Sequence, residues 1–163
     1  MSIFNRKSPK LNPDDEKIIQ FIIDFLDNKL ELDREGKAEI LDLEEWEYII
    51  FHSLNQIQFT HKLQTSFTYR IDFDTNNNTL ILQNFHRISK FKKMGDGTFV
   101  LHKLTELFRQ VCSIKQIPKL IIIFQIWGIE NPSSESVRKL LQKEGYRKIQ
   151  EQGPEQWMIH FQI

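Results

Sequence analysis

Cysteine is almost absent from this chain, which holds one, Cys112, in 163 residues. A single cysteine excludes an intramolecular disulfide framework and any metal site built from several thiolates. Because Cys112 falls in an apolar helical pattern, we expect its thiol to be buried and inert. No apolar run approaches the roughly 20 residues of a membrane span, and residues 1–10 lack the apolar core of a signal peptide. We therefore expect a cytoplasmic protein.

Net charge is absent as well, because 22 basic residues balance 22 acidic ones. The two signs are not evenly distributed: residues 1–47 hold 13 acidic and 7 basic side chains, and the remainder is basic. A basic C-terminal part could attract a phosphorylated ligand or nucleic acid, and an acidic N-terminal part could favour a cationic substrate. Solvated helix faces are the ordinary explanation of both.

The hydrophobic content is sufficient for one folded core. Hydrophobic residues make up 40% of the chain and include 13 Phe, which argues against disorder throughout. A chain of this length suits one domain better than two. We expect a single domain over residues 1–163, with a helical N-terminal part over 1–60 and the main core over 67–163.

Two helices are predicted in the N-terminal part. Pro13 and the acidic residues after it are typical of a helix start, and apolar residues continue at helical spacing to Leu30. A second helix is predicted from Asp42, a candidate N-cap, to Leu54. Its expected apolar face consists of Leu43, Trp46, Ile49, Ile50 and Leu54.

Strands dominate the next part of the chain. Residues 67–73 alternate between apolar and polar, residues 75–78 form an asparagine-rich turn, and residues 79–85 resume the alternation. This pattern predicts an antiparallel hairpin. Helical spacing over residues 100–111 then predicts a third helix.

The C-terminal part is predicted to add one buried strand, one helix and two short strands. Residues 120–126 form an apolar run typical of a strand that is buried on both faces. A helix starts near Ser133 and ends before Gly145, which is a C-cap candidate. Residues 146–149 and 157–163 read as strands around the turn at Gly153 and Pro154.

A glycine-containing loop lies between the hairpin and the third helix. Gly95 and Gly97 flank Asp96 there. Such a loop can bind a pyrophosphate, because glycine lets the backbone approach closely and the helix start presents unpaired N–H groups. Taken alone the signal is weak, because Asp-Gly is also an ordinary turn dipeptide.

The surroundings of this loop resemble a known family. Residues 91–98, 124–131 and 136–146 are similar, in order and spacing, to the coenzyme A loop, fifth strand and fourth helix of the GNAT superfamily of acyl-CoA-dependent N-acyltransferases. The resemblance covers about residues 67–163. It implies an α/β fold with a mixed, mostly antiparallel sheet, helices on both faces, and a splay between the fourth and fifth strands.

The resemblance also implies a function and a set of site residues. It implies transfer of an acetyl or acyl group from acetyl-CoA or another acyl-CoA, as co-substrate, to an amine. Glu130 or His86 would act as the catalytic base. The residues expected to bind the co-substrate are Arg87, Ile88, Lys92, Lys93, Gly95, Asp96, Gly97, Thr98 and Asn131. The spacings of the histidines predict no metal site.

Two departures from the family pattern leave catalysis open. Leu141 stands where the family commonly has a tyrosine that protonates the leaving thiolate, and Asp96 would repel a nearby phosphate unless it points to solvent. The alternative is therefore a catalytically inactive GNAT-like binding or regulatory module. A nucleic-acid-associated domain is a weaker third reading, because no basic stripe with interleaved aromatics is present. We expect a small-molecule or peptide amine as partner, no membrane and no nucleic acid; a homodimer is compatible with the sequence.

Overall fold

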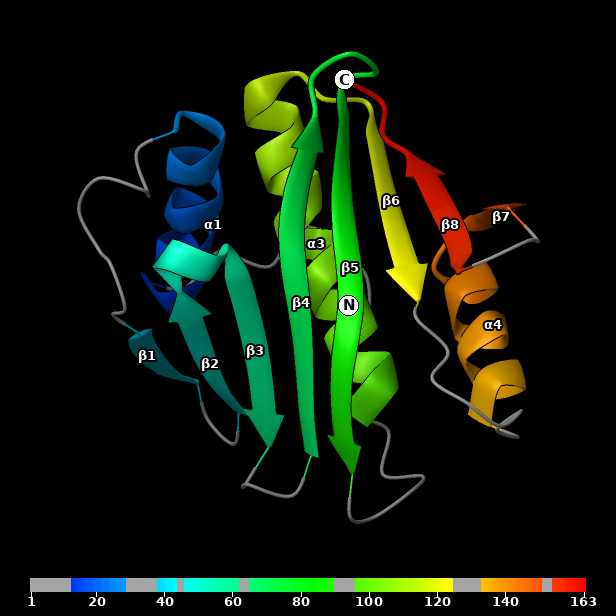
Figure 1. Cartoon of the computed structure of the whole chain (residues 1–163), viewed down its shortest axis with the longest axis horizontal. Coiled ribbons are helices and arrows are strands. Elements are labelled where there is room, and N and C mark those ends of the chain that lie inside the picture. Colours follow the sequence, from blue (N-terminus) through cyan, green and yellow to red (C-terminus); the bar gives the residue numbers. More distant parts are fainter. Residues whose placement is uncertain are drawn as a thin grey trace, which may run out of the picture.

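The computed structural model describes residues 13–28, 38–43, 46–61, 65–89, 96–124, 133–150 and 154–163. Figure 1 shows their arrangement as one twisted sheet with helices packed against it. In chain order the elements are α1 (Pro13–Leu26), β1 (Ala38–Leu43), β2 (Trp46–Phe51), the 3-10 helix η2 (His52–Leu54), β3 (Gln56–His61), β4 (Thr65–Asp74), β5 (Thr79–Ser89), α3 (Asp96–Lys115), β6 (Lys119–Phe124), α4 (Ser133–Lys143), β7 (Arg147–Gln150) and β8 (Glu155–His160). No helix in these ranges is long and apolar enough to cross a membrane.

The eight strands form one sheet in the order β1-β2-β3-β4-β5-β6-β8-β7. Every neighbouring pair is antiparallel except β5 and β6, which run parallel. A parallel pair needs a crossover connection, and α3 supplies it. The predicted mixed and mostly antiparallel sheet is confirmed.

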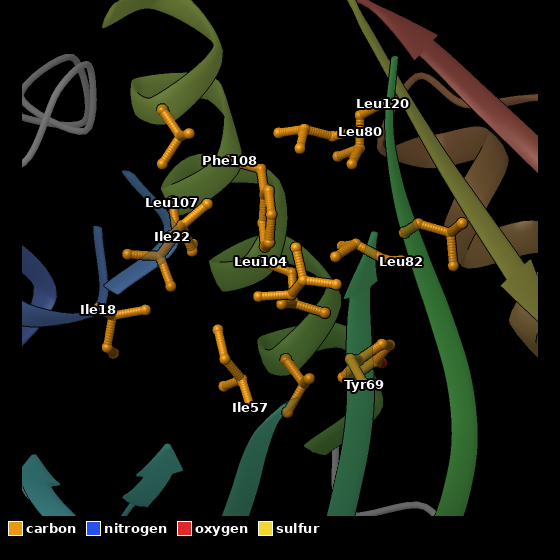
Figure 2. Packing of buried hydrophobic residues seen from close by; sticks show 14 of the residues in the cluster. Ile18, Ile22, Ile57, Tyr69, Leu80, Leu82, Leu104, Leu107, Phe108 and Leu120 are labelled. Atoms are coloured by element: carbon orange, nitrogen blue, oxygen red, sulfur yellow. The ribbon is translucent and has the colours of Figure 1, made fainter. Parts of the chain in front are cut away.

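The core lies between α1, α3 and one face of the sheet. Leu80 and Leu82 of β5 are fully buried, and in Figure 2 they point toward Leu104 and Phe108 of α3. Ile18 and Ile22 of α1 close the same core from the other side of α3 (Figure 2). Full burial of each such aliphatic or aromatic side chain contributes about 1.5–3 kcal/mol.

Side-chain contacts place α1 and α4 on the same face as α3. Lys103 of α3 donates to Asp15 of α1 across 2.7 Å. His102 of α3 lies 3.0 Å from an oxygen of Glu144, directly after α4, and a Cβ added to Gly145 would lie 3.4 Å from Ile159, whose side chain faces the core. Helices were expected on both faces of the sheet. In the described ranges, the three α-helices lie on one face.

The predicted helix from Asp42 to Leu54 is wrong. The structure has the end of β1, all of β2 and the short helix η2 in that stretch. The burial pattern decides between the two readings: Trp46, Tyr48 and Ile50 are buried at a period of two, and the residues between them are half-buried. Aromatic and β-branched residues favour strands, and here Tyr48 packs edge-on against Phe59 of the neighbouring strand β3.

The remaining elements are confirmed with small changes of boundary. The hairpin from residue 67 to 85 is part of a longer one, β4–β5, and the third helix begins at Asp96. Gly145 adopts a φ of +99°, and the Tyr146 N–H donates to the Leu141 carbonyl at 2.9 Å. This is the left-handed helix end predicted from the glycine.

A buried ion pair attaches α4 to the sheet. The Glu155 carboxylate, 6% exposed, accepts hydrogen bonds from Arg138 Nε at 3.0 Å and from the indole N–H of Trp157 at 3.3 Å. The Arg138 guanidinium holds the pKa of Glu155 below its ordinary value of 4.5. The pair fixes the position of the helix that borders the candidate site.

Replacing Arg138 by glutamine should lower the free energy of unfolding at pH 7 by roughly 2 kcal/mol, because it removes a charge-assisted bond from a buried carboxylate. A lowered folded pKa adds stability above the unfolded value of 4.5, and this stability is lost as the pH falls through the folded pKa. Urea unfolding between pH 7 and pH 3 should therefore show a smaller loss of stability on acidification in the variant than in the wild type.

The matched control is Lys139→Gln, which removes a positive charge from an exposed neighbouring position on the same helix. We expect this control to change stability by less than about 0.5 kcal/mol. Equal effects of the two substitutions at pH 7 would contradict the role of the Arg138–Glu155 pair.

Candidate active site

The site is defined by the place where β5 and β6 part. Their parallel pairing runs from Thr79–Lys119 to Asn84–Phe124, where β6 ends. On its other edge β5 stays paired with β4 as far as Thr65–Ser89. Figure 1 shows β5 continuing beyond the tip of β6. In the described part of the chain, no strand pairs with the β6-side edge of β5 from Phe85 to Ser89.

A β-bulge lies at the same level. Tyr69 pairs with Asn84 and Thr68 pairs with His86, so that Phe85 is an extra residue without a partner on β4. A bulge bends its strand and increases the local twist. The bulge therefore bends β5 at the level where its pairing with β6 ends, while β5 stays paired with β4.

The first turn of α3 is the second component. Asp96, Gly97 and Thr98 are its first three residues. The first four N–H groups of an α-helix have no partner within the helix, and the helix dipole adds a partial positive charge there. An anionic group is therefore stabilised at this position.

Aromatic stacking fixes the start of α3 against the sheet. The ring of Phe99 stacks on Trp46 of β2 at a centroid distance of 4.8 Å, and Trp46 stacks on His61 of β3, also at 4.8 Å. Such pairs add about 0.5–1.5 kcal/mol beyond the area they bury. The orientation of the first turn is thus set by side chains from two strands.

Gly97 lies at an ordinary contact distance from α4. Among the described residues, a Cβ added to Gly97 would meet only Leu140 of α4, at 3.9 Å. The sequence analysis placed Gly97 in a loop, whereas the structure places it within the helix. Its missing side chain therefore serves no turn geometry.

The predicted site residues fall into three groups. Gly97 and Thr98 are described fully and lie in the first turn of α3, and Asp96 opens that turn. The backbones of His86, Arg87 and Ile88 lie in the part of β5 beyond β6, which brings these residues to one place along the strand. The other residues lie outside the described ranges, namely Lys92, Lys93, Gly95, Glu130 and Asn131.

No hydroxyl that could act as an acid is available from the expected position on α4. Leu141 is fully buried, so a tyrosine side chain at this position would have to displace packed neighbours. The phenol of Tyr146, which follows α4 in the chain, is 2% exposed. Its burial raises the pKa of Tyr146, since the phenolate would be poorly solvated.

The hydroxyl proton of Tyr146 is also used in a hydrogen bond within the protein. Thr105 Oγ1 donates its only hydrogen to the Leu101 carbonyl at 2.8 Å. The contact of 2.8 Å between Thr105 Oγ1 and the Tyr146 hydroxyl must then have Tyr146 as donor. Tyr146 is a structural link between α3 and the start of β7 and has no proton to give to a thiolate.

Three of the described histidines, His52, His61 and His102, have structural partners. His52 Nε2 lies 3.0 Å from a Glu39 oxygen, His102 Nδ1 lies 3.0 Å from a Glu144 oxygen, and His61 stacks on Trp46. Among the described residues no group of His, Cys, Asp and Glu could hold a metal ion. Burial raises the pKa of the Cys112 thiol to about 12, which agrees with the predicted inert thiol.

Sequence reasoning missed Asn84. This residue takes part in the last β5–β6 pair and precedes the bulge. The signal was present, because an amide follows two leucines at alternate positions, Leu80 and Leu82, on the face that packs against α3. Without the register, however, the sequence could not indicate that β6 ends beside it.

Comparison with solved structures identifies the fold. The N-terminal domain of ribosomal-protein-alanine acetyltransferase from Clostridium acetobutylicum superposes with a TM-score of 0.51 at 13% identity, over 76% of this chain and 96% of that one. The GNAT domain of S. lividans PAT (TM-score 0.43, 9% identity, 66% of this chain and 62% of that one) and a GNAT-family acetyltransferase from Listeria monocytogenes (0.40, 10%, 93% of each) are more distant. No family model and no curated protein sequence matches the chain. The chain therefore shares the fold of that acetyltransferase domain.

The contact distance at Gly97 predicts that alanine is tolerated there. Because a Cβ would make an ordinary contact with Leu140 and alanine restricts the unfolded chain, Gly97→Ala should raise the free energy of unfolding by about 0.5 kcal/mol. Chemical denaturation of both proteins measures the difference. A loss of more than about 1 kcal/mol would contradict the described position of the first turn.

Proposed function

We propose that this protein is an N-acyltransferase that moves an acetyl or other acyl group from coenzyme A to an amine. One observation carries the proposal: β5 extends beyond its parallel partner β6 and has no strand on that side from Phe85 to Ser89 in the described chain. The GNAT fold supports it, because the solved structures with this fold include acetyltransferases.

The unpaired edge of β5 suits the arm of coenzyme A. The pantetheine arm contains two amide groups, and an extended amide chain can add to a free strand edge through backbone hydrogen bonds. The stretch from Asn84 to Ser89 spans about 17 Å at the usual rise of a strand. The arm would therefore lie along β5 with its thioester at the parting from β6.

The first turn of α3 suits the pyrophosphate. Its unpaired N–H groups, at Asp96 to Thr98, follow β5 in the chain and would hold the anionic end of the co-substrate. The proposal also includes the other residues that the family resemblance assigns to co-substrate binding, namely Arg87, Ile88, Lys92, Lys93, Gly95 and Asn131. Gly97 contributes by having no side chain between the backbone and Leu140.

The reaction would proceed directly from a ternary complex. The amine nitrogen attacks the thioester carbon, the C–N bond forms, and the C–S bond breaks with its electron pair leaving on sulfur. Glu130 or His86 would accept the proton that the amine nitrogen loses. The coenzyme A thiolate would finally take up a proton and become the free thiol. The products are an amide and free coenzyme A.

Without an acid at residue 141, transfer should be slow. Leu141 offers no proton and the Tyr146 hydroxyl is committed to Thr105. General acid–base assistance is typically worth about 10²- to 10⁴-fold in rate. The same two observations favour the second candidate, a GNAT-like module that binds coenzyme A without turnover.

Acetyl-CoA should raise the melting temperature of the wild-type protein, because it binds the native state preferentially. At 100 times its dissociation constant a ligand adds about 2.7 kcal/mol. The same scan on Gly97→Val should show no shift, since the branched side chain would occupy the space beside the first turn. No shift of the folded wild type at millimolar acetyl-CoA would refute both candidate functions.

A free-thiol release assay with polyamines, amino acids and peptides separates the two candidates. Acylated amine together with released thiol would establish the transferase, and a thermal shift without thiol release would favour the binding module. For Gly97→Val, the matched folding control is Gly97→Ala, because the structure accommodates the alanine side chain.

A further inference from the structure

Asn84 occupies a distinctive position in the core-facing rows of the sheet. Side chains alternate along a strand, so Asn84 shares the core face with Leu80 and Leu82, both fully buried. The pairing register continues this row through Tyr69 of β4, Phe124 of β6 and Glu155 of β8. Asn84 is therefore a carboxamide on the apolar, helix-covered face, at the last pair before β5 and β6 part.

The surroundings of Asn84 do not account for this carboxamide. Tyr69, the opposite residue on β4, is buried, whereas Asn84 is half-buried, so solvent reaches the core face at this level. Of the other polar groups of the row, the Glu155 carboxylate is occupied by Arg138 and Trp157, and the buried Tyr69 also has a partner. Within the described ranges the Asn84 carboxamide has no side-chain hydrogen-bond partner.

A polar group that is partly removed from water loses free energy unless it finds a partner. The bulge immediately after Asn84 fixes the direction of its strand, and pairing with Phe124 and Tyr69 fixes its backbone on both sides. The carboxamide is therefore held at a defined place on a rigid element. This is the arrangement required of a group that must meet a ligand in one geometry.

We propose that the Asn84 Nδ2–H group donates a hydrogen bond to the carbonyl oxygen of the bound acyl thioester. This inference rests on the proposed function, which places the thioester where β5 and β6 part. During attack by the amine nitrogen, the carbonyl π electrons move to oxygen and the Nδ2–H bond stabilises the charge formed there. When the C–S bond breaks, those electrons reform the carbonyl, and the proton lost by the amine is balanced by the proton gained by the thiol.

Asparagine side chains are effective donors in such oxyanion-stabilising sites, where loss of one donor typically costs about 10²- to 10³-fold in kcat. Asn84 would thus be a catalytic residue that acts without exchanging a proton. Its role is independent of the missing acid at Leu141, because it stabilises the carbonyl oxygen and not the leaving sulfur.

The test compares Asn84→Leu with wild type, using acetyl-CoA labelled with ¹³C at the thioester carbonyl. A hydrogen bond to the oxygen lowers the carbonyl stretching frequency, so infrared difference spectra of the bound label should show a higher frequency in the variant. In the thiol-release assay, kcat should fall about 10²-fold or more while KM for acetyl-CoA changes little. Affinity for free coenzyme A, which has no acyl carbonyl, should be unchanged.

Gln83→Leu is the matched control. Gln83 is the neighbouring amide on β5 and lies on the opposite face, where it accepts a hydrogen bond from Arg70 at 2.9 Å. This variant should leave the carbonyl frequency and kcat as in the wild type. Urea unfolding of both variants identifies any loss of folding.

The outcomes separate the inference from the function on which it rests. If wild type binds acetyl-CoA and folded Asn84→Leu leaves the carbonyl frequency unchanged, the role of Asn84 is overturned while the proposed co-substrate stands. If wild type binds no acetyl-CoA, the proposed function fails and this inference fails with it. A frequency change in Gln83→Leu equal to that in Asn84→Leu would also overturn the role.

Discussion

Backbone pairing between β5 and β6 stops at Asn84 and Phe124, and the site follows from this limit. A strand inside a sheet has both edges paired, so its backbone groups are not available to a ligand. Beyond residue 84 only the β4 side of β5 is paired in the described chain. In the described chain β5 thereby stays held by β4 while its other edge is unpaired beyond residue 84.

Packing on the core face makes this arrangement stable. Leu80 and Leu82 hold the paired half of β5 against α3, and Trp46 and Phe99 hold the start of the same helix against β2. The start of α3, proposed to bind phosphate, and the β6-side edge of β5 are therefore fixed to a common core. Neither depends on the other for its position, which favours a site formed before the ligand arrives.

The C-terminal elements could be predicted from sequence because each has one apolar face with one clear period. Residues 67–73 alternate, residues 100–111 repeat at helical spacing, and the left-handed Gly145 ends α4. The stretch around Trp46 could not be assigned in this way. Ile49 and Ile50 are adjacent, which suits a helix face as well as a strand with apolar residues on both sides, and the pairing of Tyr48 with Phe59 settled the choice.

The candidate site was predictable only in part, for a physical reason. The sequence shows a glycine-containing loop before a helix, and the structure begins α3 inside that segment, at Asp96. The end of β6 relative to β5 depends on register between residues about 40 positions apart, which no local pattern specifies. The same limit explains why Asn84 was missed and why the burial of Leu141 and the committed proton of Tyr146 emerged only from packing.

Amide hydrogen exchange with and without acetyl-CoA tests the central claim most directly, namely that the free edge of β5 and the start of α3 bind one acyl-CoA. Backbone hydrogen bonds to a bound arm would slow the exchange of amides in residues 85–89, and bound phosphates would slow those in residues 96–98. The account predicts that added protection is concentrated in these two segments and is much weaker in β1 and β7 at the sheet edges. Unchanged exchange in both segments at saturating acetyl-CoA, or protection centred on another part of the chain, would contradict it.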